Sequence, residues 1–256
     1  MILAIDMGNT NIVIGCVDDE KIHFEERIST DYSKTEIEYY VLLKTVMDLH
    51  KTDIEKITGS IISSVVPPLL KVIKNAVIKL TGSEPLVVGP GVKTGLNILM
   101  DNPRQVGSDM IVDAVACINE YGAPLAIIDI GTATTISIVD KNKNYIGGVI
   151  MPGVRVASDS LVSKTAQLQK VSLEATDKYI GKNTIDCMKS GIIHGNAACI
   201  DGMLTRMEEE IGYPLTAVAT GGLARVIIPN CKRKIIEDQR LLLKGLKIIY
   251  DKNKQQ

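Results

Sequence analysis

The sequence predicts an α/β fold made of two similar lobes, and three observations support this prediction. Short runs rich in β-branched residues alternate with longer segments whose apolar residues recur at helical spacing. The hydrophobic residues are mostly aliphatic, with one Phe and no Trp, which suits sheets covered by helices. A pattern near the N-terminus recurs about half a chain length later, at residues 128–136.

The first half of the chain alternates strand and helix patterns in the order expected of one lobe. Turns at Gly8-Asn9 and Asp18-Asp19 divide the apolar residues of the N-terminal segment into strands. Pro67-Pro68 suits the first turn of a helix. We therefore expect strands within 1–30 and at 57–63 and 85–88, and helices at 35–50, 67–80 and from 108 to before 122.

The second half repeats this plan. Gly131 and the polar run at 141–144 separate three strand patterns, and a long helical pattern follows. The chain closes with an amphipathic pattern and a polar tail. The expected strands are 125–130, 134–139, 145–151 and 215–219, and the expected helices are 183–211 and 240–252.

The repeated pattern predicts an internal duplication. Residues 5–13 are Ile-Asp-Met-Gly-Asn-Thr-Asn-Ile-Val, and residues 128–136 are Ile-Asp-Ile-Gly-Thr-Ala-Thr-Thr-Ile. In both, an apolar strand ends in Asp, a Gly allows a turn, and small polar residues lead into a second strand. We expect an N-terminal lobe at 1–118 and a C-terminal lobe at 119–256.

Composition excludes several classes of protein. Lys and Arg number 29 and Asp and Glu 30, so the chain has no basic surplus for nucleic acid or an anionic membrane. No apolar run reaches about 18–20 residues, and the N-terminus has no basic segment and signal core. The five cysteines and three histidines lack zinc-site spacing. Free thiols and a cytoplasmic location are the expectation.

The first repeat, at residues 6–13, has the chemistry of a phosphate-binding hairpin. Gly8 lets the backbone approach a ligand closely, and Asn9, Thr10 and Asn11 add side-chain donors. Asp6 ends the first strand, where its carboxylate can hold Mg²⁺ through water. The alternative is that Asp6 and Gly8 only shape a hairpin.

The second repeat gathers Asp129, Gly131, Thr132, Thr134 and Thr135 within an apolar segment. Such side chains are costly to bury without partners, and phosphate or a cation would supply them.

A third glycine turn, Thr220-Gly221-Gly222-Leu223, follows a predicted strand. Its position suits a backbone that passes close to a nucleoside, although a simple strand-to-helix turn would look the same.

Six motifs, in this order along the chain, resemble type III pantothenate kinases, which have the actin-like (acetate and sugar kinase) fold. Each motif is short, but together they span nearly the whole chain. They are D-x-G-N-T at 6–10, G-x-D at 107–109, D-x-G-T-A-T-T at 129–135, G-G-x-I-x-P-G at 147–153, G-K-N-T at 181–184 and T-G-G-L-A at 220–224.

The resemblance implies two ribonuclease-H-like lobes with ATP in the cleft between them. It implies transfer of the γ-phosphoryl group of ATP to pantothenate, the first step of coenzyme A synthesis, by a homodimer. It also implies the roles of individual residues. ATP would be bound by Asp6, Met7, Gly8, Asn9, Thr10, Asn11, Ile12, Val13, Thr132, Gly221 and Gly222, pantothenate by Met100, Gly107, Ser108, Asp109, Met110 and Thr184, and K⁺ or NH₄⁺ by Asp129.

Asp109 is the residue that the resemblance implies as catalytic base. Phosphoryl transfer needs mainly positioning and charge neutralisation, and a carboxylate within reach of the acceptor hydroxyl orients it and takes its proton. The alternative is that Ser108 or Asp109 only caps a helix, since both residue types favour that position.

Two departures from the family pattern fall at the implied substrate site. Met110 stands where the family has Arg, and Met100 where it has Tyr. Losing a hydrogen bond to a charged group costs roughly 1.5–3 kcal/mol. Gln169 and Arg240-Leu-Leu-Leu243 also depart from the pattern. Three functions follow: a pantothenate kinase with rebuilt substrate contacts, a kinase for another small hydroxyl compound, or a regulatory relative that binds nucleotide without turnover.

Overall fold

The computed structural model describes residues 1–254, which form two compact units. The first unit comprises Met1–Leu96, Asp101–Ala116 and the segment from Arg240 onward, and the second comprises Asn97–Met100 and Cys117–Gln239. Among the described residues, no helix is both long and apolar enough to cross a membrane.

The sheet of the first unit has the strand order β3-β2-β1-β4-β5. Its three N-terminal strands are antiparallel neighbours, whereas β4 and β5 extend the sheet in parallel. The strands are β1 (Ile2–Met7), β2 (Asn11–Val17), β3 (Ile22–Ser29), β4 (Ser60–Ser64) and β5 (Leu86–Val87).

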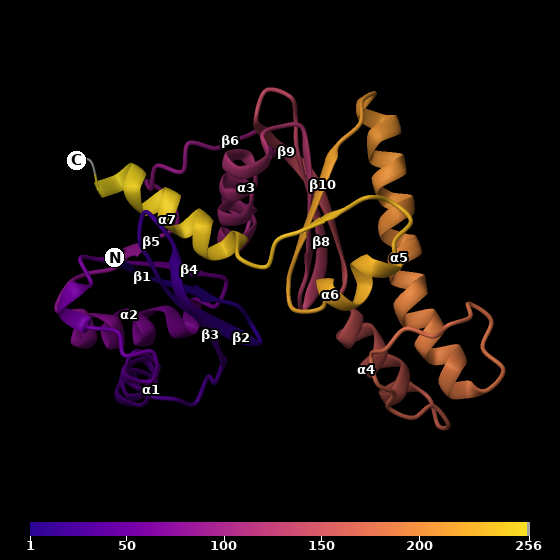
Figure 1. The fold of residues 1–256 in the computed structure, drawn as a ribbon, viewed down its shortest axis with the longest axis horizontal. Helices are drawn as coiled ribbons and strands as arrows, with labels where there is room; N and C mark the ends of the chain where they lie inside the picture. The colour runs from indigo at the N-terminus through magenta and orange to yellow at the C-terminus, as the bar shows by residue number, and fades with distance from the viewer. Residues whose placement is uncertain (255–256) are drawn as a thin grey trace. The chain divides into compact units, whose positions relative to one another are not determined.

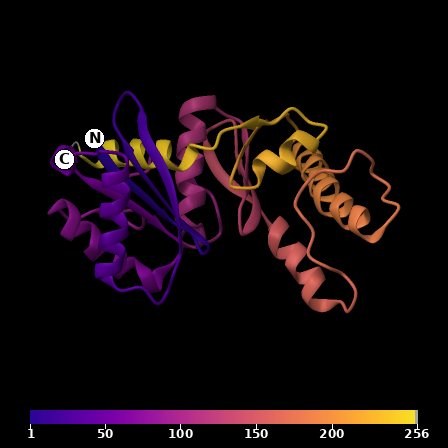
Figure 2. The ribbon, with the colours of Figure 1, turned by 60° about the horizontal axis from the view of Figure 1, so that its bottom comes forward.

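Successive side chains of β1 point to opposite faces of the sheet, and a pair of helices packs on each face. Leu3, Ile5 and Met7 pack with α1 (Glu36–Leu49) and α2 (Pro67–Thr81). Ile2 and Ala4 point the other way and pack with α3 (Ser108–Tyr121) and α7 (Leu241–Lys254). Figures 1 and 2 show α1 beside α2, and the yellow helix α7 alongside the indigo strands. Both faces of the sheet are therefore covered, as the aliphatic composition predicts.

The second unit contains a sheet of order β11-β10-β7-β8-β9-β6. The long helix α5 (Thr184–Ile211) and the short α6 (Ala224–Ile227) pack on one face through Ile, Leu, Met and Ala side chains. The strands are β6 (Asn97–Ile98), β7 (Leu125–Ile130), β8 (Ala133–Val139), β9 (Asn144–Pro152), β10 (Thr216–Thr220) and β11 (Ile236–Glu237). Short 3₁₀ turns lie at Ile54–Lys56, Pro103–Gln105 and Ile228–Asn230.

The two sheets have matching topology, which supports the predicted duplication. The order β3-β2-β1-β4-β5 corresponds to β9-β8-β7-β10-β11, with antiparallel and parallel neighbours in the same places. The extra strand β6 pairs with β9 at the edge of the second sheet. The predicted α/β fold with two related lobes is therefore confirmed.

The C-terminal helix differs from the expected division of the chain. We expected residues 119–256 to form one lobe, but α7 belongs to the first unit. Leu243, Leu246 and Ile249 are buried in the cluster that contains Ile2. A Cβ on Gly245 would lie 2.2 Å from the carbonyl oxygen of Val112, so this glycine lets α7 approach α3 closely. The helical periodicity of α7 predicts its apolar face but not which sheet covers it.

Helix α4 (Val154–Lys164) was not predicted, and neither were β6 and β11. In α4 only Val154 and Ser158 are buried, so its sequence carries a weak apolar pattern. The strands β6 and β11 contain two residues each, too few for an alternating pattern.

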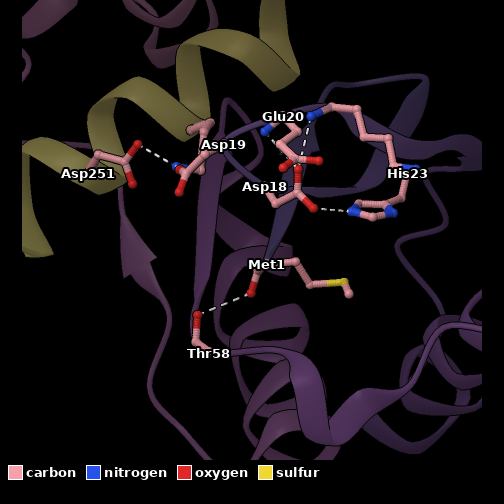
Figure 3. A network of polar contacts seen from close by, with 9 residues as sticks. Met1, Asp18, Asp19, Glu20, His23, Thr58 and Asp251 are labelled. Atoms are coloured by element: carbon pink, nitrogen blue, oxygen red, sulfur yellow. Dashed lines mark hydrogen bonds and ion pairs between the residues drawn. The ribbon is translucent and has the colours of Figure 1, made fainter.

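The turn between β2 and β3 is organised by one carboxylate (Figure 3). Asp18 Oδ1 accepts hydrogen bonds from the backbone N–H groups of Glu20 and Lys21, both 2.9 Å. Its Oδ2 contacts His23 Nε2. The backbone N–H of Lys21, with smaller contributions from His23 and Glu20, holds the pKa of Asp18 well below its ordinary value of 3.8.

We expect Asp18→Ala to lower the melting temperature by about 2–4 °C at pH 7, because two turn N–H groups lose their acceptor. A depressed carboxylate pKa stabilises the fold above the unfolded-state pKa, and that stability is lost as the pH falls through the folded-state pKa. The difference from wild type should therefore narrow below about pH 4 in thermal scans. Glu20→Ala, which keeps its backbone N–H, is the control. If the difference in melting temperature stays constant down to pH 2, the stabilisation does not come from the ionised Asp18 carboxylate.

Candidate active site

The first hairpin joins β1 to β2 through a tight turn. Gly8 N–H donates to Asn11 O at 3.0 Å, and the side chains of Asn9, Thr10 and Asn11 are exposed. Asp6, at the end of β1, is 6% exposed. The side chains of Met7, Ile12 and Val13 are buried in the core, so these residues can meet a ligand only through their backbone.

Strand pairing brings the end of β4 next to Asp6. In the parallel register of β1 and β4, Asp6 is the partner of Ser63. The buried Ser63 hydroxyl donates to Ser108 Oγ at 2.9 Å. The Asp of the hairpin and the start of α3 therefore meet at the same edge of the first sheet.

Ser108 ties the first turn of α3 to β4. Its hydroxyl accepts from the backbone N–H of Ser64 at 3.0 Å and donates to the carbonyl oxygen of Ser64 at 3.0 Å. Ser108 is thus the first residue of the helix and uses its side chain to bond the neighbouring strand. The Ser108 hydroxyl thus bonds the strand rather than its own helix, whereas Asp109, the other candidate for the cap, accepts from an N–H of the first turn.

Asp109 follows at the N-terminal end of α3 and is half-buried. Its Oδ1 accepts from the backbone N–H of Met110 at 2.8 Å. Burial raises the pKa of Asp109 above its ordinary value of 3.8, against the opposing effect of the backbone N–H groups. A Cβ on Gly107 would lie 2.4 Å from Asp109 Oδ1, so glycine leaves room for the carboxylate.

The second hairpin, between β7 and β8, has a shorter turn. Gly131 N–H donates to Ala133 O at 2.9 Å, and Asp129 is the cross-strand partner of Thr135. Thr132 is exposed at the turn. Thr134 points into the core, where its hydroxyl has no hydrogen-bond partner among the described residues. Of the polar residues in this hairpin, Asp129 and Thr135 therefore share one face, and Thr134 occupies the other.

The third glycine turn packs against Asp129. Thr220, at the end of β10, is the register partner of Asp129. Gly221 has φ +94°, and a Cβ there would lie 2.3 Å from Asp129 Oδ1. Leu223 N–H donates to Ile130 O at 3.2 Å, which closes the turn that contains Gly222 onto β7. Two segments that are far apart in sequence thus form one site in the second unit.

Gly153 completes this cluster, and reasoning from residue types alone missed it. A Cβ on Gly153 would lie 2.2 Å from Thr132 O and 2.6 Å from Gly131 O. The start of α4 therefore rests on the turn of the second hairpin. Only the motif at 147–153 signalled this segment in the sequence.

The two remaining expected substrate residues, Met100 and Thr184, belong to the second unit, whereas Asp109 belongs to the first. Met100 belongs to the second unit, with its Sδ 3.5 Å from the position of a Cβ on Gly147. Thr184 is exposed as the first residue of α5. A pocket of about 470 Å³ lies beside the start of this helix. Its lining includes three lysines, Lys178, Lys182 and Lys189.

Within residues 1–254, no three His, Cys, Asp or Glu side chains come together as a metal site. A cation at either hairpin would therefore need ligands besides carboxylates, such as backbone carbonyls, water and the oxygens of a bound phosphate.

A family model described as type III pantothenate kinase matches residues 2–206. The chain belongs to this family. A type III pantothenate kinase from Exiguobacterium sibiricum is 44% identical over 254 residues, which cover 99% of this chain and 100% of the relative.

Solved structures agree on the fold. A Baf family protein from Campylobacter jejuni matches with a TM-score of 0.62 at 20% identity, covering 100% of both chains. The ADPNP-bound activator of 2-hydroxyisocaproyl-CoA dehydratase from Clostridium difficile matches with a TM-score of 0.55 at 13% identity, covering 99% of this chain and 96% of the other. As a member of the type III pantothenate kinase family, this chain is a phosphotransferase, and its fold is actin-like.

We expect Asp109→Asn to raise the melting temperature at pH 7. Because burial raises the folded-state pKa, the ionised carboxylate opposes folding at pH values above that pKa, and the opposition disappears as the pH falls below it. The amide keeps an oxygen for the Met110 N–H without the charge. Thermal scans from pH 3 to 8 should show a stability gain that is largest at neutral pH, whereas a loss at pH 7 would contradict it.

Proposed function

We propose that this chain transfers the γ-phosphoryl group of ATP to the primary hydroxyl of pantothenate, giving 4′-phosphopantothenate. The observation that carries the proposal is the position of Asp109. Ser63 and Ser108 hold it at the sheet edge where the first phosphate hairpin also lies. Family membership supplies the reaction class, and the contacts around Asp109 support the residue roles proposed here.

Asp109 is the proposed base. Its half-buried carboxylate, at the N-terminal end of a helix, can accept the hydrogen bond of an acceptor hydroxyl and take its proton as the O–P bond forms. Burial raises the pKa of Asp109, which makes its carboxylate a better proton acceptor. Gly107, Ser108 and Met110 would contact pantothenate from the same turn.

The first hairpin is the proposed site for the ATP phosphates. The backbone of residues 6–13 and the exposed side chains of Asn9, Thr10 and Asn11 offer hydrogen-bond donors. Asp6 is nearly buried at the base of the hairpin and is the residue that would hold Mg²⁺ through water, where the cation neutralises phosphate charge.

The second hairpin carries the other ATP contacts and a monovalent cation in this proposal. Asp129 would hold K⁺ or NH₄⁺, with Thr132 exposed at the turn for ATP. Gly221 and Gly222 would bring backbone close to the nucleoside. The support is the packing of the Gly221 turn directly on Asp129.

The two methionines at the substrate site favour one alternative. Met100 and Met110 cannot donate hydrogen bonds, so the acceptor could be a small hydroxyl compound less polar than pantothenate. A relative that binds nucleotide without turnover is the other alternative, and the retained Asp109 argues against it. Thr184, the remaining proposed pantothenate contact, keeps its hydroxyl.

The proposal includes a homodimer in the cytoplasm. Tyr179, Ile180 and Ile185 expose 71%, 82% and 53% of their surface around the start of α5, an apolar group that a second copy would cover. All five cysteines are free thiols, as expected of a reducing compartment.

The decisive experiment measures ADP release with ATP, Mg²⁺ and K⁺ or NH₄⁺, with and without pantothenate. We expect pantothenate-dependent ADP and a product of the mass of 4′-phosphopantothenate. Asp109→Asn should lower kcat by about 10²-fold or more and leave ATP affinity within about twofold, because the base acts only in transfer. Asp48→Asn, at the exposed end of α1, is the matched control.

Equal turnover by wild type and Asp109→Asn would remove Asp109 from the catalytic role. ADP release with another hydroxyl compound but not with pantothenate would favour the second alternative. ATP binding without turnover of any acceptor would favour the regulatory one.

We expect the purified chain to have twice the monomer mass in light scattering. Ile180→Glu should produce monomers, because it places a charge in the apolar group. Ile37→Glu makes the same change at an exposed isoleucine on α1 and should leave the dimer intact. A wild-type monomer at micromolar concentration, or a dimer that Ile180→Glu does not weaken, would argue against this surface.

A further inference from the structure

Thr30, immediately after β3, makes two hydrogen bonds to the turn of the first hairpin. Its hydroxyl donates to the carbonyl oxygen of Gly8 at 2.6 Å, and its backbone N–H donates to the carbonyl oxygen of Thr10 at 3.0 Å. One residue outside the hairpin thus engages two carbonyl groups of its turn.

These bonds matter for the electrostatics of the hairpin. A phosphate is attracted by backbone N–H groups and repelled by carbonyl oxygens, so a phosphate turn has to direct its carbonyls away from the ligand. Gly8 and Thr10 direct theirs to Thr30, and Asn11 directs its carbonyl to the N–H of Gly8. Three carbonyls of the turn therefore have donors within the protein.

Thr30 is itself held in place by a buried tyrosine. Tyr39, on α1, is fully buried, and its hydroxyl donates to the carbonyl oxygen of Asp31 at 2.8 Å while accepting from the N–H of Asp31 at 3.0 Å. The Asp31 carboxylate accepts from Ser33 N–H and Oγ and from Lys34 Nζ, at 2.9, 2.6 and 2.7 Å. The Tyr39 hydroxyl therefore holds both peptide units that flank Asp31, one of which joins Asp31 to Thr30.

We propose that Thr30 is a positioning residue for ATP, which sets the phosphate-binding conformation of the first hairpin and is held by Tyr39 through Asp31. This inference rests on the proposed function, because it takes the hairpin as the phosphate site. Thr30 touches the hairpin and not the reacting atoms, so it should affect ATP affinity rather than the chemistry at the acceptor.

The test is a set of three variants in the full chain, with binding of Mg-ATP measured by calorimetry and KM and kcat by ADP release. Thr30→Val keeps the shape of the side chain and removes its donor, which should weaken ATP binding about tenfold and raise the KM for ATP in parallel. The KM for pantothenate should stay within about twofold. Thr30→Ser restores the donor and should bind ATP within about threefold of wild type.

Thr45→Val is the matched control. The Thr45 hydroxyl also donates to a backbone carbonyl, that of Val41 at 2.8 Å, on the exposed side of α1. It should leave ATP binding unchanged, which separates the effect of Thr30 from a general effect of the substitution on stability.

The outcomes separate this inference from the proposed function. If wild type binds no Mg-ATP, the proposed function fails and this inference with it. If wild type binds ATP and Thr30→Val binds it equally well, or if Thr30→Ser shares the defect of Thr30→Val, only the positioning role is overturned. Should Thr30→Val not fold, Tyr39→Phe takes its place, since it removes the hydroxyl that holds Asp31. Unchanged ATP affinity in a folded Tyr39→Phe would overturn the role.

Discussion

The parallel pairing of β1 with β4 is the constraint on which the rest of the first unit's site depends. Parallel strands end at the same edge of a sheet, so the hairpin after β1 and the chain after β4 meet there. The register that aligns Asp6 with Ser63 then lets Ser63 reach Ser108, which fixes the start of α3 and the direction of Asp109. The second unit uses the same parallel pairing between β7 and β10 to bring the Gly221 turn onto Asp129.

Two glycines of the sequence motifs, Gly153 and Gly221, make close contacts that are long-range in sequence. Gly153 and Gly221 each have space for no side chain, because backbone or carboxylate atoms lie within 3 Å of where a Cβ would be. Both rest on the second hairpin or on the strand that leads into it. Gly153 and Gly221 are thus parts of one packed cluster in the folded second unit, which gives each of them a physical role beyond local turn formation.

Much of this fold follows from the sequence, because long periodic elements identify themselves. The hairpins at Gly8 and Gly131 and the helices α2, α3, α5 and α7 lie within a few residues of their predicted positions. Some predicted site residues of the two hairpins, such as Asn9, Thr10 and Thr132, are exposed at the turns, whereas Asp6 and its neighbours in β1 and β2 are buried. The assignment of these residues to ATP, pantothenate and cations remains a prediction. Long-range contacts could not be predicted from the sequence. A single polar residue such as Thr30 gives no periodic signal, and its role depends on which turn lies beside the end of β3 in the folded chain. The assignment of α7 to the C-terminal lobe was wrong for the same reason, because its packing on the first sheet is a long-range contact.

Helix α7 also has a consequence for how the chain acquires its structure. It supplies Leu243, Leu246 and Ile249 to the face of the first sheet formed by Ile2, Ala4 and Ile61. During synthesis these strands leave the ribosome before the second unit, and the helix that covers them leaves after it. The first unit is therefore completed only after the whole second unit has been made, and until then one apolar face of its sheet stays partly uncovered, in the state in which a nascent chain depends most on chaperones.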